Sequence, residues 1–503
     1  MILEREERLE EISTMMQSTK LREKATGREA IIKKKELKQQ NETVTTTQQK
    51  KMEKKSISRR AHCLVLIYPV QGHINPMLQF SKLLEHQGVR VTLVTTLSYY
   101  KNLQSVPPSI AIETISDGFD NGITEAEEFK AYLERFWQVG PETFAKLLEK
   151  LGESKDDGHV DCVVYDSCLP WALDVAKRFE IVAASYLTQS MSVNSIYYHF
   201  LLGKLKAPLT QHEIFLPCLP KFHLQDMPSF FFDEDHTVLD FGVAQFSNIH
   251  RTDWILCNTF YELDQEIVDW AVKIWPNLKT IGPNVPSFFL DKRCENDEDY
   301  GVTMYKSEEY CMEWLDDKPK GSVVYVSFGS MVKLGEEQME EIAFCLRECS
   351  SYFLWVVRAS EETKLPKDFE EKTEKGLVIT WCSQLKVLVH EAVGCFVTHC
   401  GWNSTLETLC LGVPTVAIPC WSDQNTNAKY IVDVWKIGIR ASTYEKKLVH
   451  AESLEHCIKE IMERNKEMKN NAIRWKTLAL RAVSEGGSSY ENIIQFTNSL
   501  LHS

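Results

Sequence analysis

The most informative absences from this sequence of 503 residues concern paired cysteines, long apolar runs and one glycine motif. Fifteen cysteines are present, but none has the C-x-x-C spacing of a zinc or redox site, and most lie singly within apolar runs. This pattern is typical of reduced thiols in a cytosolic protein. No apolar stretch could span a bilayer, and the charged N-terminus lacks the apolar core of a signal peptide. The sequence therefore predicts a cytoplasmic protein without integral membrane association.

A dinucleotide fingerprint is also missing, because no G-x-G-x-x-G follows a predicted strand. This absence disfavours a dehydrogenase built on the same kind of parallel sheet. The net charge of −14 argues against nucleic acid as the main partner. The sequence gives no sign of an oligomer interface, and we expect a monomer.

Residues 1–60 differ in composition from the rest of the chain. They carry 16 Lys and Arg against 10 Asp and Glu, with no aromatic side chains and few branched apolar ones. Such a segment cannot bury enough surface to offset the entropy lost on ordering, so we predict a disordered N-terminal extension. A basic tail that touches RNA or a membrane surface is the alternative. Met52 would be a natural start just before the first predicted strand, and our hypothesis is that residues 1–51 are dispensable or an artefact of start-site assignment.

From residue 61 onward, apolar strand patterns alternate with helical patterns. The predicted strands lie at 62–69, 89–96, 160–166, 180–187 and 254–260, and in a second series at 321–330, 352–358, 376–381, 393–399 and 414–419. Apolar strands that alternate with amphipathic helices indicate parallel sheets covered on both faces.

The predicted architecture is two doubly wound Rossmann-like domains, at 61–280 and 306–485. Residues 281–305, rich in Pro, Gly and charge, are predicted to link them. Ligands of such sheets bind outside the carboxyl ends of the strands, which here means the cleft between the two domains.

The segment "HCGWNSTLETLCLGVP", residues 399–414, predicts an anion site at a helix start. A strand ends before it, a helix follows the loop, and Gly412 with Pro414 ends that helix. The first turn presents unpaired N–H groups and the positive end of the helix dipole. Gly401 allows another group to approach the backbone, and Asn403 adds a side-chain donor. These features favour a phosphate-binding site.

A purely structural alternative exists for the same helix start. Ser404 and Glu407 have the S-x-x-E spacing of a capping box, and this spacing taken alone favours capping. A capping box does not account for His399, Gly401 and Trp402 as well.

Residues 381–424, "WCSQLKVLVHEAVGCFVTHCGWNSTLETLCLGVPTVAIPCWSDQ", closely resemble the signature box of plant UDP-dependent glycosyltransferases. The resemblance extends over essentially all of 61–503, through "PVQGHINPMLQFSK", "TIGPNVPSFFLDKR", "VSFGS" and "EGGSS". It looks closest to the branch that glucosylates small acids, phenols and terpenoids. Residues 1–51 have no counterpart in the family pattern.

The resemblance implies a GT-B fold, in which the last helix, at 486–503, packs back on the N-terminal domain. It also implies a set of residues that bind a UDP-sugar. Trp381 and Cys382 would meet the uracil, Gln384 and Glu407 the ribose, and Trp402, Asp423 and Gln424 the sugar. His399, Gly401, Asn403 and Ser404, with Ser330, would hold the diphosphate. The final Gln of the box usually accompanies glucose, so UDP-glucose is the expected donor substrate, and no cofactor is implied.

A general base is expected from the N-terminal domain. His73 lies at the predicted turn between the first strand and the first helix, although a lone loop histidine is more often structural. Asp166 ends the strand at 160–166 and would bond the far nitrogen of His73; its alternative role is an N-cap. Both residues match the family's catalytic pair by position.

The implied reaction is a single in-line displacement with inversion, giving a β-glucoside or a glucose ester. Main-chain amides and hydroxyls at 399–404 would stabilise the departing diphosphate without a metal. The acceptor is expected to bind segments around 130–140 and 188–200. A non-catalytic sensor of UDP-sugars is a further alternative, which the presence of His73 and Asp166 disfavours.

Overall fold

The computed structural model describes residues 60–501 except for 104–109, 123–125, 127, 154–158, 295, 302–307, 370–372, 374 and 444–447. Apart from Arg60, the predicted N-terminal extension and the hypothesis on residues 1–51 lie outside the described residues. Residues Ala61–Ser503 form one compact unit that contains both main sheets.

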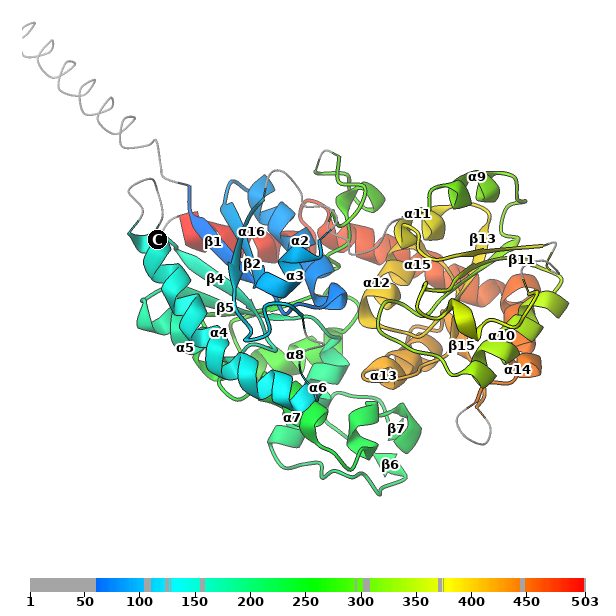
Figure 1. Cartoon of the computed structure of the whole chain (residues 1–503), viewed down its shortest axis with the longest axis horizontal. Helices are drawn as coiled ribbons and strands as arrows, with labels where there is room; N and C mark the ends of the chain where they lie inside the picture. The colour runs from blue at the N-terminus through cyan, green and yellow to red at the C-terminus, as the bar shows by residue number, and fades with distance from the viewer. Residues whose placement is uncertain are drawn as a thin grey trace, which may run out of the picture. The chain divides into compact units, whose positions relative to one another are not determined.

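The first sheet has seven strands in the order β3-β2-β1-β4-β5-β8-β9 (Figure 1). Its strands are β1 His62–Leu66, β2 Arg90–Thr96, β3 Ala111–Ile115, β4 Cys162–Asp166, β5 Val182–Leu187, β8 Trp254–Cys257 and β9 Leu278–Thr280. All neighbouring strands are parallel. The chain runs outward from β1 in one direction and from β4 in the other, so these two strands form the switch point of the sheet.

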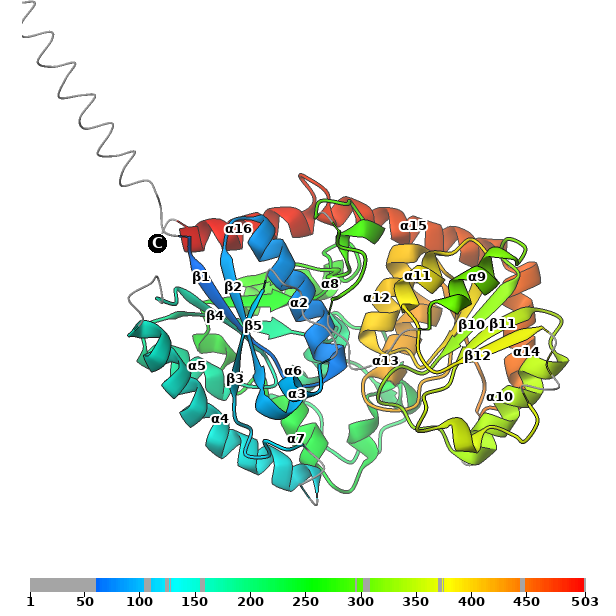
Figure 2. The ribbon, with the colours of Figure 1, turned by 45° about the horizontal axis from the view of Figure 1, so that its top comes forward.

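Helices cover both faces of this sheet, as the apolar strands predict. Figure 2 shows α2 Gln71–His86 and α16 Ser488–Leu501 on one face, and α4 Phe129–Gly152 and α5 Trp171–Arg178 on the other. Each face has its own apolar cluster, one built around α2 and α16 and the other around α4 and α5. The same part of the chain also contains α3 Leu97–Lys101, α6 Met191–Leu201, α7 Thr237–Ala244, α8 Gln265–Ile274 and a short antiparallel pair, β6 Glu213–Ile214 and β7 Phe222–His223.

The second sheet has six parallel strands in the order β12-β11-β10-β13-β14-β15. Its strands are β10 Val323–Ser327, β11 Tyr352–Val356, β12 Gly376–Ile379, β13 Val393–Thr398, β14 Thr415–Ala417 and β15 Gly438–Arg440. Its helices include α9 Tyr310–Asp316, α10 Glu336–Glu348, α11 Gln384–Val389, α12 Trp402–Leu411, α13 Gln424–Lys429, α14 Ala451–Lys459 and α15 Lys466–Val483. The predicted pair of doubly wound parallel sheets is confirmed. We call residues 60–280 the N-terminal lobe and residues 308–483 the C-terminal lobe.

The last helix joins the two lobes. After α15, which packs on α12, α16 lies against the first sheet, where Phe496 contacts Phe80 and Trp254 with ring centroids 6.0 and 5.5 Å away. Asn492 on the same helix donates a hydrogen bond to the Thr280 carbonyl at 2.9 Å. Within the described ranges, no helix combines the length and the apolar character that crossing a membrane requires.

Candidate active site

The switch points of the two sheets carry the candidate catalytic and phosphate-binding residues. In the N-terminal lobe, His73 follows β1 and Asp166 ends β4. In the C-terminal lobe, Ser330 follows β10 and His399 follows β13. The carboxyl ends of strands at a switch point leave a crevice in which ligands of such sheets bind.

His73 lies on a helix rather than in the turn that the sequence predicts. Helix α2 begins at Gln71, and the N–H groups of His73 and Ile74 already donate to the Val70 carbonyl, at 2.9 and 3.1 Å. Pro76 falls inside the helix. The first turn therefore fixes the backbone of His73 and gives its ring a defined position.

A short hydrogen bond joins His73 to Asp166. The His73 Nδ1 and Asp166 Oδ2 atoms are 2.7 Å apart, and the side chains are 23% and 0% exposed. The other carboxylate oxygen accepts the Cys168 N–H at 3.0 Å. Asp166 is not the N-cap of α5, which is Pro170, so that alternative is wrong. His73 Nε2 has no hydrogen-bond partner among the residues that the structure describes and is the nitrogen available to a substrate.

Opposing effects set the pKa of His73. Burial lowers it, whereas the charge of Asp166 and the hydrogen bond to it raise it, and the charge of Asp423 adds to the increase. The net result is a pKa above the ordinary value of 6.5. The carboxylate thus stabilises the imidazolium that forms when the ring takes a proton.

The start of α12 is open to an anion. Its N-cap is Gly401, which has no side chain to bond the first N–H groups of the helix. The capping-box alternative for Ser404 and Glu407 is wrong, because the helix begins at Trp402 and Ser404 lies inside it. The Glu407 carboxylate instead accepts hydrogen bonds from the Tyr300 hydroxyl at 2.9 Å and from Gln384 Nε2 at 2.6 Å. The N–H groups and the dipole remain available to a phosphate.

His399 is held between two glycines. A Cβ added to Gly329 would lie 2.7 Å from His399 Cε1, and one added to Gly401 would lie 2.5 Å from His399 Nε2. Burial and the charge of Arg358 lower the pKa of His399 to about 4, although a hydrogen bond to the Ser327 backbone opposes the shift. His399 is therefore a neutral imidazole at pH 7, and the Ser327 backbone already accepts its single N–H.

The residues assigned to uracil and ribose lie beside α12. Gln384 begins α11 and donates from Nε2 to Ser404 Oγ at 2.9 Å as well as to Glu407. Cys382 is buried, with its sulfur 3.5 Å from the Tyr325 hydroxyl. Trp381 is half-buried after β12, and its carbonyl accepts the Glu308 N–H at 3.0 Å.

Two of the residues assigned to the sugar follow β14. Asp423 is buried and accepts Asn427 Nδ2 at 2.8 Å, and the same amide donates to the Cys400 carbonyl at 2.9 Å. Gln424 Oε1 accepts the N–H groups of residues 420 and 421, both at 2.9 Å. The third residue differs, because the Trp402 indole N–H is already used in a 2.9 Å bond to the Asn258 carbonyl. The Trp402 indole N–H is therefore not available to a sugar hydroxyl.

The two lobes touch at the site itself. Asn403 Nδ2, at the start of α12, donates to the Gly72 carbonyl at 2.7 Å, one residue before His73. Asp423 is close enough for its charge to raise the pKa of His73. The structure thus brings the predicted base next to the predicted diphosphate and sugar residues.

Within the described part of the chain, one group of side chains has the proximity that a metal site requires. Ligand atoms of His73, Asp166 and Cys168 all lie within 4.8 Å of one another. However, burial, followed by the charge of Asp166, raises the pKa of the Cys168 thiol well above its usual range, so it is a poor ligand. The carboxylate is also occupied by two protein donors. The geometry favours a hydrogen-bonded pair.

Sequence reasoning missed two Asp-x-Asp triplets, at 233–235 and 297–299. The Asp297 carboxylate accepts hydrogen bonds from Gln79 at 2.7 Å and from Lys82 at 2.9 Å. The Asp235 carboxylate accepts two bonds from Thr237. These carboxylates are thus engaged by donors of the protein.

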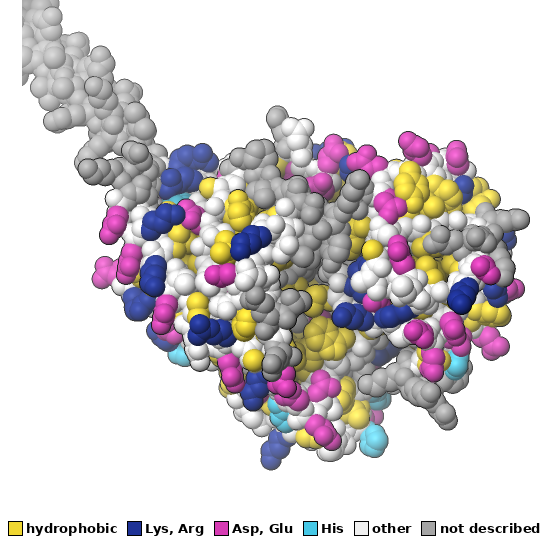
Figure 3. Space-filling view, viewed as in Figure 1, with side chains coloured by type: hydrophobic (Ala, Val, Ile, Leu, Met, Phe, Trp, Pro, Cys, Tyr) yellow, Lys and Arg dark blue, Asp and Glu magenta, His cyan; other side chains and the backbone are white. Residues whose placement is uncertain are grey.

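Sequence reasoning also missed aromatic residues beside the base. The Tyr68 ring lies 5.5 Å from His73 and 5.4 Å from Phe241, which in turn contacts Phe129 at 6.0 Å. An aromatic residue two positions after the β1 strand was the available signal. In Figure 3, apolar side chains also gather between the two lobes. From the predicted acceptor segment 188–200, Ser190 donates to Asn427 at 3.2 Å, so this segment reaches the sugar end of the site.

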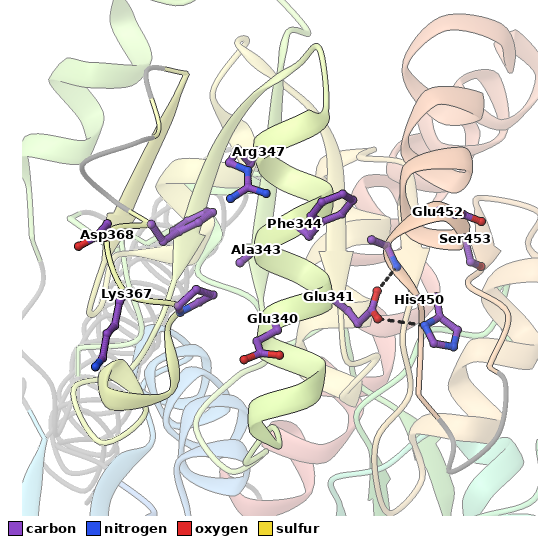
Figure 4. A pocket seen from close by; sticks show the side chains of 13 residues that line it. Glu340, Glu341, Ala343, Phe344, Arg347, Lys367, Asp368, His450, Glu452 and Ser453 are labelled. Atoms are coloured by element: carbon purple, nitrogen blue, oxygen red, sulfur yellow. Dashed lines mark hydrogen bonds and ion pairs between the residues drawn. The ribbon is translucent and has the colours of Figure 1, made fainter.

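A separate hollow lies elsewhere on the C-terminal lobe. It measures about 790 Å³ and is bordered by α10, α14 and residues 366–369 (Figure 4). None of the predicted site residues lines it. Its Glu341 carboxylate is bonded to His450 at 3.0 Å and to the Ala451 N–H at 2.6 Å, so these groups already satisfy one another.

The family model for UDP-glucoronosyl and UDP-glucosyl transferase matches residues 274–480. Mogroside I-E synthase of Siraitia grosvenorii is 48% identical over 444 residues, which cover 86% of this chain and 97% of that protein. Flavonol 7-O-beta-glucosyltransferase UGT74F1 of Arabidopsis thaliana is 44% identical over 454 residues, or 88% of this chain and 98% of that protein.

Solved structures show the same architecture. The crystal structure of Os79 from O. sativa in complex with UDP has a TM-score of 0.81 and 35% identity, covering 87% of this chain and 100% of that one. The same protein has been solved with U2F and trichothecene. The GT-B fold expected from the sequence is confirmed.

Proposed function

The chain belongs to the UDP-glucoronosyl and UDP-glucosyl transferase family, and from this premise we propose that it transfers glucose from UDP-glucose to a hydroxyl or carboxyl group of a small lipophilic plant metabolite. It is a glycosyltransferase enzyme of the plant UDP-dependent type. The hydrogen-bonded pair of His73 and Asp166 carries the proposal. His73 directly follows Gly72, whose carbonyl accepts the Asn403 amide. That contact links a base and an anion-binding helix start in a single site.

His73 acts as the general base. Its Nε2 takes the proton of the acceptor hydroxyl as the oxygen attacks the anomeric carbon, while Nδ1–H stays bonded to Asp166. The ring becomes an imidazolium, which the neighbouring carboxylate stabilises. A carboxylic acid is already ionised at pH 7, since its pKa lies near 4, and needs no base.

The start of α12 stabilises the leaving diphosphate. Negative charge grows on the bridging oxygen in the transition state, and the N–H groups of residues 402–404, which have no acceptor among the described residues, donate to it. The acceptor approaches from the N-terminal lobe while the diphosphate leaves toward the C-terminal lobe. This in-line geometry inverts the α-linked donor to a β-glycoside. No metal takes part in this scheme.

The donor's ribose and sugar have separate partners. The Glu407 carboxylate accepts both ribose hydroxyls, with Gln384 beside it, and the Trp381 ring stacks on uracil. Asp423 and Gln424 bond the sugar hydroxyls, and the terminal Gln of the box favours glucose. In this proposal, residues 61–280 bind the acceptor, residues 306–485 bind the donor, and residues 281–305 link the two. We further propose that the enzyme is a cytoplasmic monomer.

The aromatic side chains beside His73 support an apolar acceptor. Tyr68, Phe129 and Phe241 form a continuous series of ring contacts that ends at the base. Flat or fused rings gain both apolar burial and ring stacking against such a surface. The relatives named above act on a flavonol and make a mogroside, which agrees with acceptors of this kind.

Product analysis tests the proposal. The purified chain is incubated with UDP-glucose and a panel of phenols, terpenoid alcohols and carboxylic acids, with and without EDTA. We expect UDP release coupled to a β-glucoside or glucose ester, whose anomeric coupling NMR resolves, at equal rates with the chelator. An α-linked product overturns the inverting mechanism, and loss of activity in EDTA overturns the metal-free scheme. Binding of UDP without transfer to any acceptor supports the sensor alternative.

A further inference from the structure

Arg358 holds the loop that carries Ser330. It follows β11 at the carboxyl end of the second sheet, and its side chain is 11% exposed. Its Nη1 donates to the Gly329 carbonyl at 3.3 Å, and its Nη2 donates to the Val332 carbonyl. One guanidinium therefore fixes two points of the loop at 328–334, between β10 and α10.

A second cation supports the far end of the same loop. Lys364 Nζ donates to the Leu334 carbonyl at 2.7 Å and to Glu361 Oε2 at 2.9 Å. Arg358 lies farther from Glu361, with Nη2 4.0 Å from the same oxygen. Glu361 therefore pairs mainly with Lys364 and only weakly with Arg358. The three side chains keep a net positive charge beside the loop.

Peptide geometry transmits the Arg358 contact to Ser330. The C=O of Gly329 and the N–H of Ser330 belong to one trans peptide, so they point in opposite directions. Because Arg358 bonds the Gly329 carbonyl, the Ser330 N–H points away from the guanidinium. Gly329 itself packs on the His399 ring. Among the described residues, none accepts a hydrogen bond from the Ser330 N–H.

The Arg358 charge also reaches His399. After burial, this charge is the second cause of the low pKa of His399, about 4. A cation next to an imidazole favours the neutral ring, and it also creates a positive potential for an anion bound there. The positive potential favours a bound diphosphate, whereas the neutral state of His399 adds no charge of its own.

Resting on the proposed function, we infer that Arg358 is a positioning residue for the donor diphosphate, which fixes the Ser330 N–H toward that group and supplies positive potential beside His399. It acts through the loop and makes no contact with the substrate. Uracil and ribose lie outside its influence, because their partners Trp381, Gln384 and Glu407 belong to other segments.

The ratio of UDP affinity to uridine affinity tests the inference, because uridine lacks the diphosphate. Calorimetry is run on the wild type, Arg358→Gln, Arg358→Lys and the matched control Lys364→Gln. We expect Arg358→Gln to weaken UDP binding about tenfold, as removal of charge-assisted hydrogen bonds does, with uridine binding within twofold of wild type. Arg358→Lys keeps the charge but loses the planar guanidinium that bonds two carbonyls. We therefore expect an intermediate UDP affinity. Lys364→Gln should change UDP binding less than threefold.

Kinetics give a second readout. We expect Arg358→Gln to lower kcat while the KM of the acceptor and the acid limb of the pH profile stay unchanged, because His73 keeps Asp166. Equal UDP affinity in wild type and Arg358→Gln overturns the inference, and so does an equal loss for UDP and uridine, which would show a merely structural role. If Arg358→Gln does not fold, Arg358→Lys is judged by the same ratio. A wild type that binds no UDP overturns the proposed function itself.

Discussion

The two lobes each place a histidine after a strand at a switch point, and the two rings have opposite properties. His73 is bonded to the buried carboxylate of Asp166, and its pKa lies above 6.5. His399 is partly buried near Arg358, and its pKa lies at about 4. The first ring is suited to accept a proton, and the second stays neutral at pH 7. The charged neighbour, rather than the residue type, decides which role each ring takes.

In the C-terminal lobe, the pKa of a glutamate lies above that of a histidine, which is the reverse of the usual order. Burial raises the pKa of Glu407 to about 7, although its bonds from Gln384 and Tyr300 oppose the shift. On this side of the site, a glutamate titrates near neutrality and the histidine does not. The pH dependence of the enzyme should therefore have separate origins in the two lobes, which variants of each lobe can separate.

Replacing His73 should have the largest effect. We expect His73→Ala to lower kcat/KM for a phenol or alcohol by about 10³-fold, since general-base catalysis contributes about 10²–10⁴-fold. UDP binding should be unchanged, because the donor's partners lie in the other lobe. Initial rates of UDP release and calorimetry with UDP measure the two quantities.

The choice of acceptor provides the control for this variant. A carboxylic acid that the wild type uses should lose less activity in His73→Ala, because its oxygen is ionised without a base. Full activity of the variant on a phenol would exclude His73 as the base.

Asp166→Asn should make His73 resemble His399. The charge of Asp166 is a main cause of the raised pKa of His73, so its removal leaves burial, which lowers the pKa. A base must be unprotonated to act, and the acid limb of kcat/KM should therefore move to lower pH. We also expect the plateau rate to fall about 10²-fold, since the imidazolium loses its partner. A profile over pH 5–9 that keeps its acid limb in place would contradict this account.

The strands in the middle of each sheet were predictable from the sequence, and so was the segment at 381–424 that is proposed to bind the donor. Central strands such as β1 and β13 are continuous apolar runs, because both of their faces are buried. In the two main sheets, sequence reasoning left out β3, β9 and β15, which all lie at sheet edges. β3 is partly exposed along most of its length and carries a glutamate, so its pattern is too polar to identify.

The site residues likewise divide into those that the sequence predicts and those that it does not. Residues 381–424 lie in one continuous segment, and their order in the chain resembles a known pattern. The hydrogen bond from Tyr300 to Glu407 joins residues 107 positions apart, and the one from Arg358 to Gly329 joins residues 29 positions apart. No local sequence pattern predicts such contacts. Local rules also failed for Ser404 and Glu407, where the capping spacing is present but the helix begins at Trp402.

Gly401→Ala should disturb the His399 side of the site alone. The backbone of Gly401 has φ −59°, which alanine adopts without strain, so the effect comes from the Cβ, 2.5 Å from His399 Nε2. We expect UDP affinity to fall about tenfold, because the added methyl group overpacks a tight contact. The acid limb of the kcat/KM profile should stay unchanged. Calorimetry measures the affinity.

A double-mutant cycle identifies the cause of that loss. In a His399→Ala background the clash disappears, so His399→Ala/Gly401→Ala should bind UDP within about twofold of His399→Ala. Additive losses would show that Gly401 acts through something other than the histidine.

The smallest expected effect concerns Glu407 and the pH dependence of uridine binding. Ribose hydroxyls donate to the carboxylate, so bound uridine stabilises its charged form, and affinity should fall as the pH drops through about 7. Uridine is the suitable probe because it carries no phosphate that titrates in this range. We expect a loss of about fivefold between pH 8 and pH 6, measured by calorimetry, and none in Glu407→Gln, which cannot ionise. His399, with a pKa of about 4, stays neutral across this range, so a dependence that survives in Glu407→Gln would assign the titration to another group.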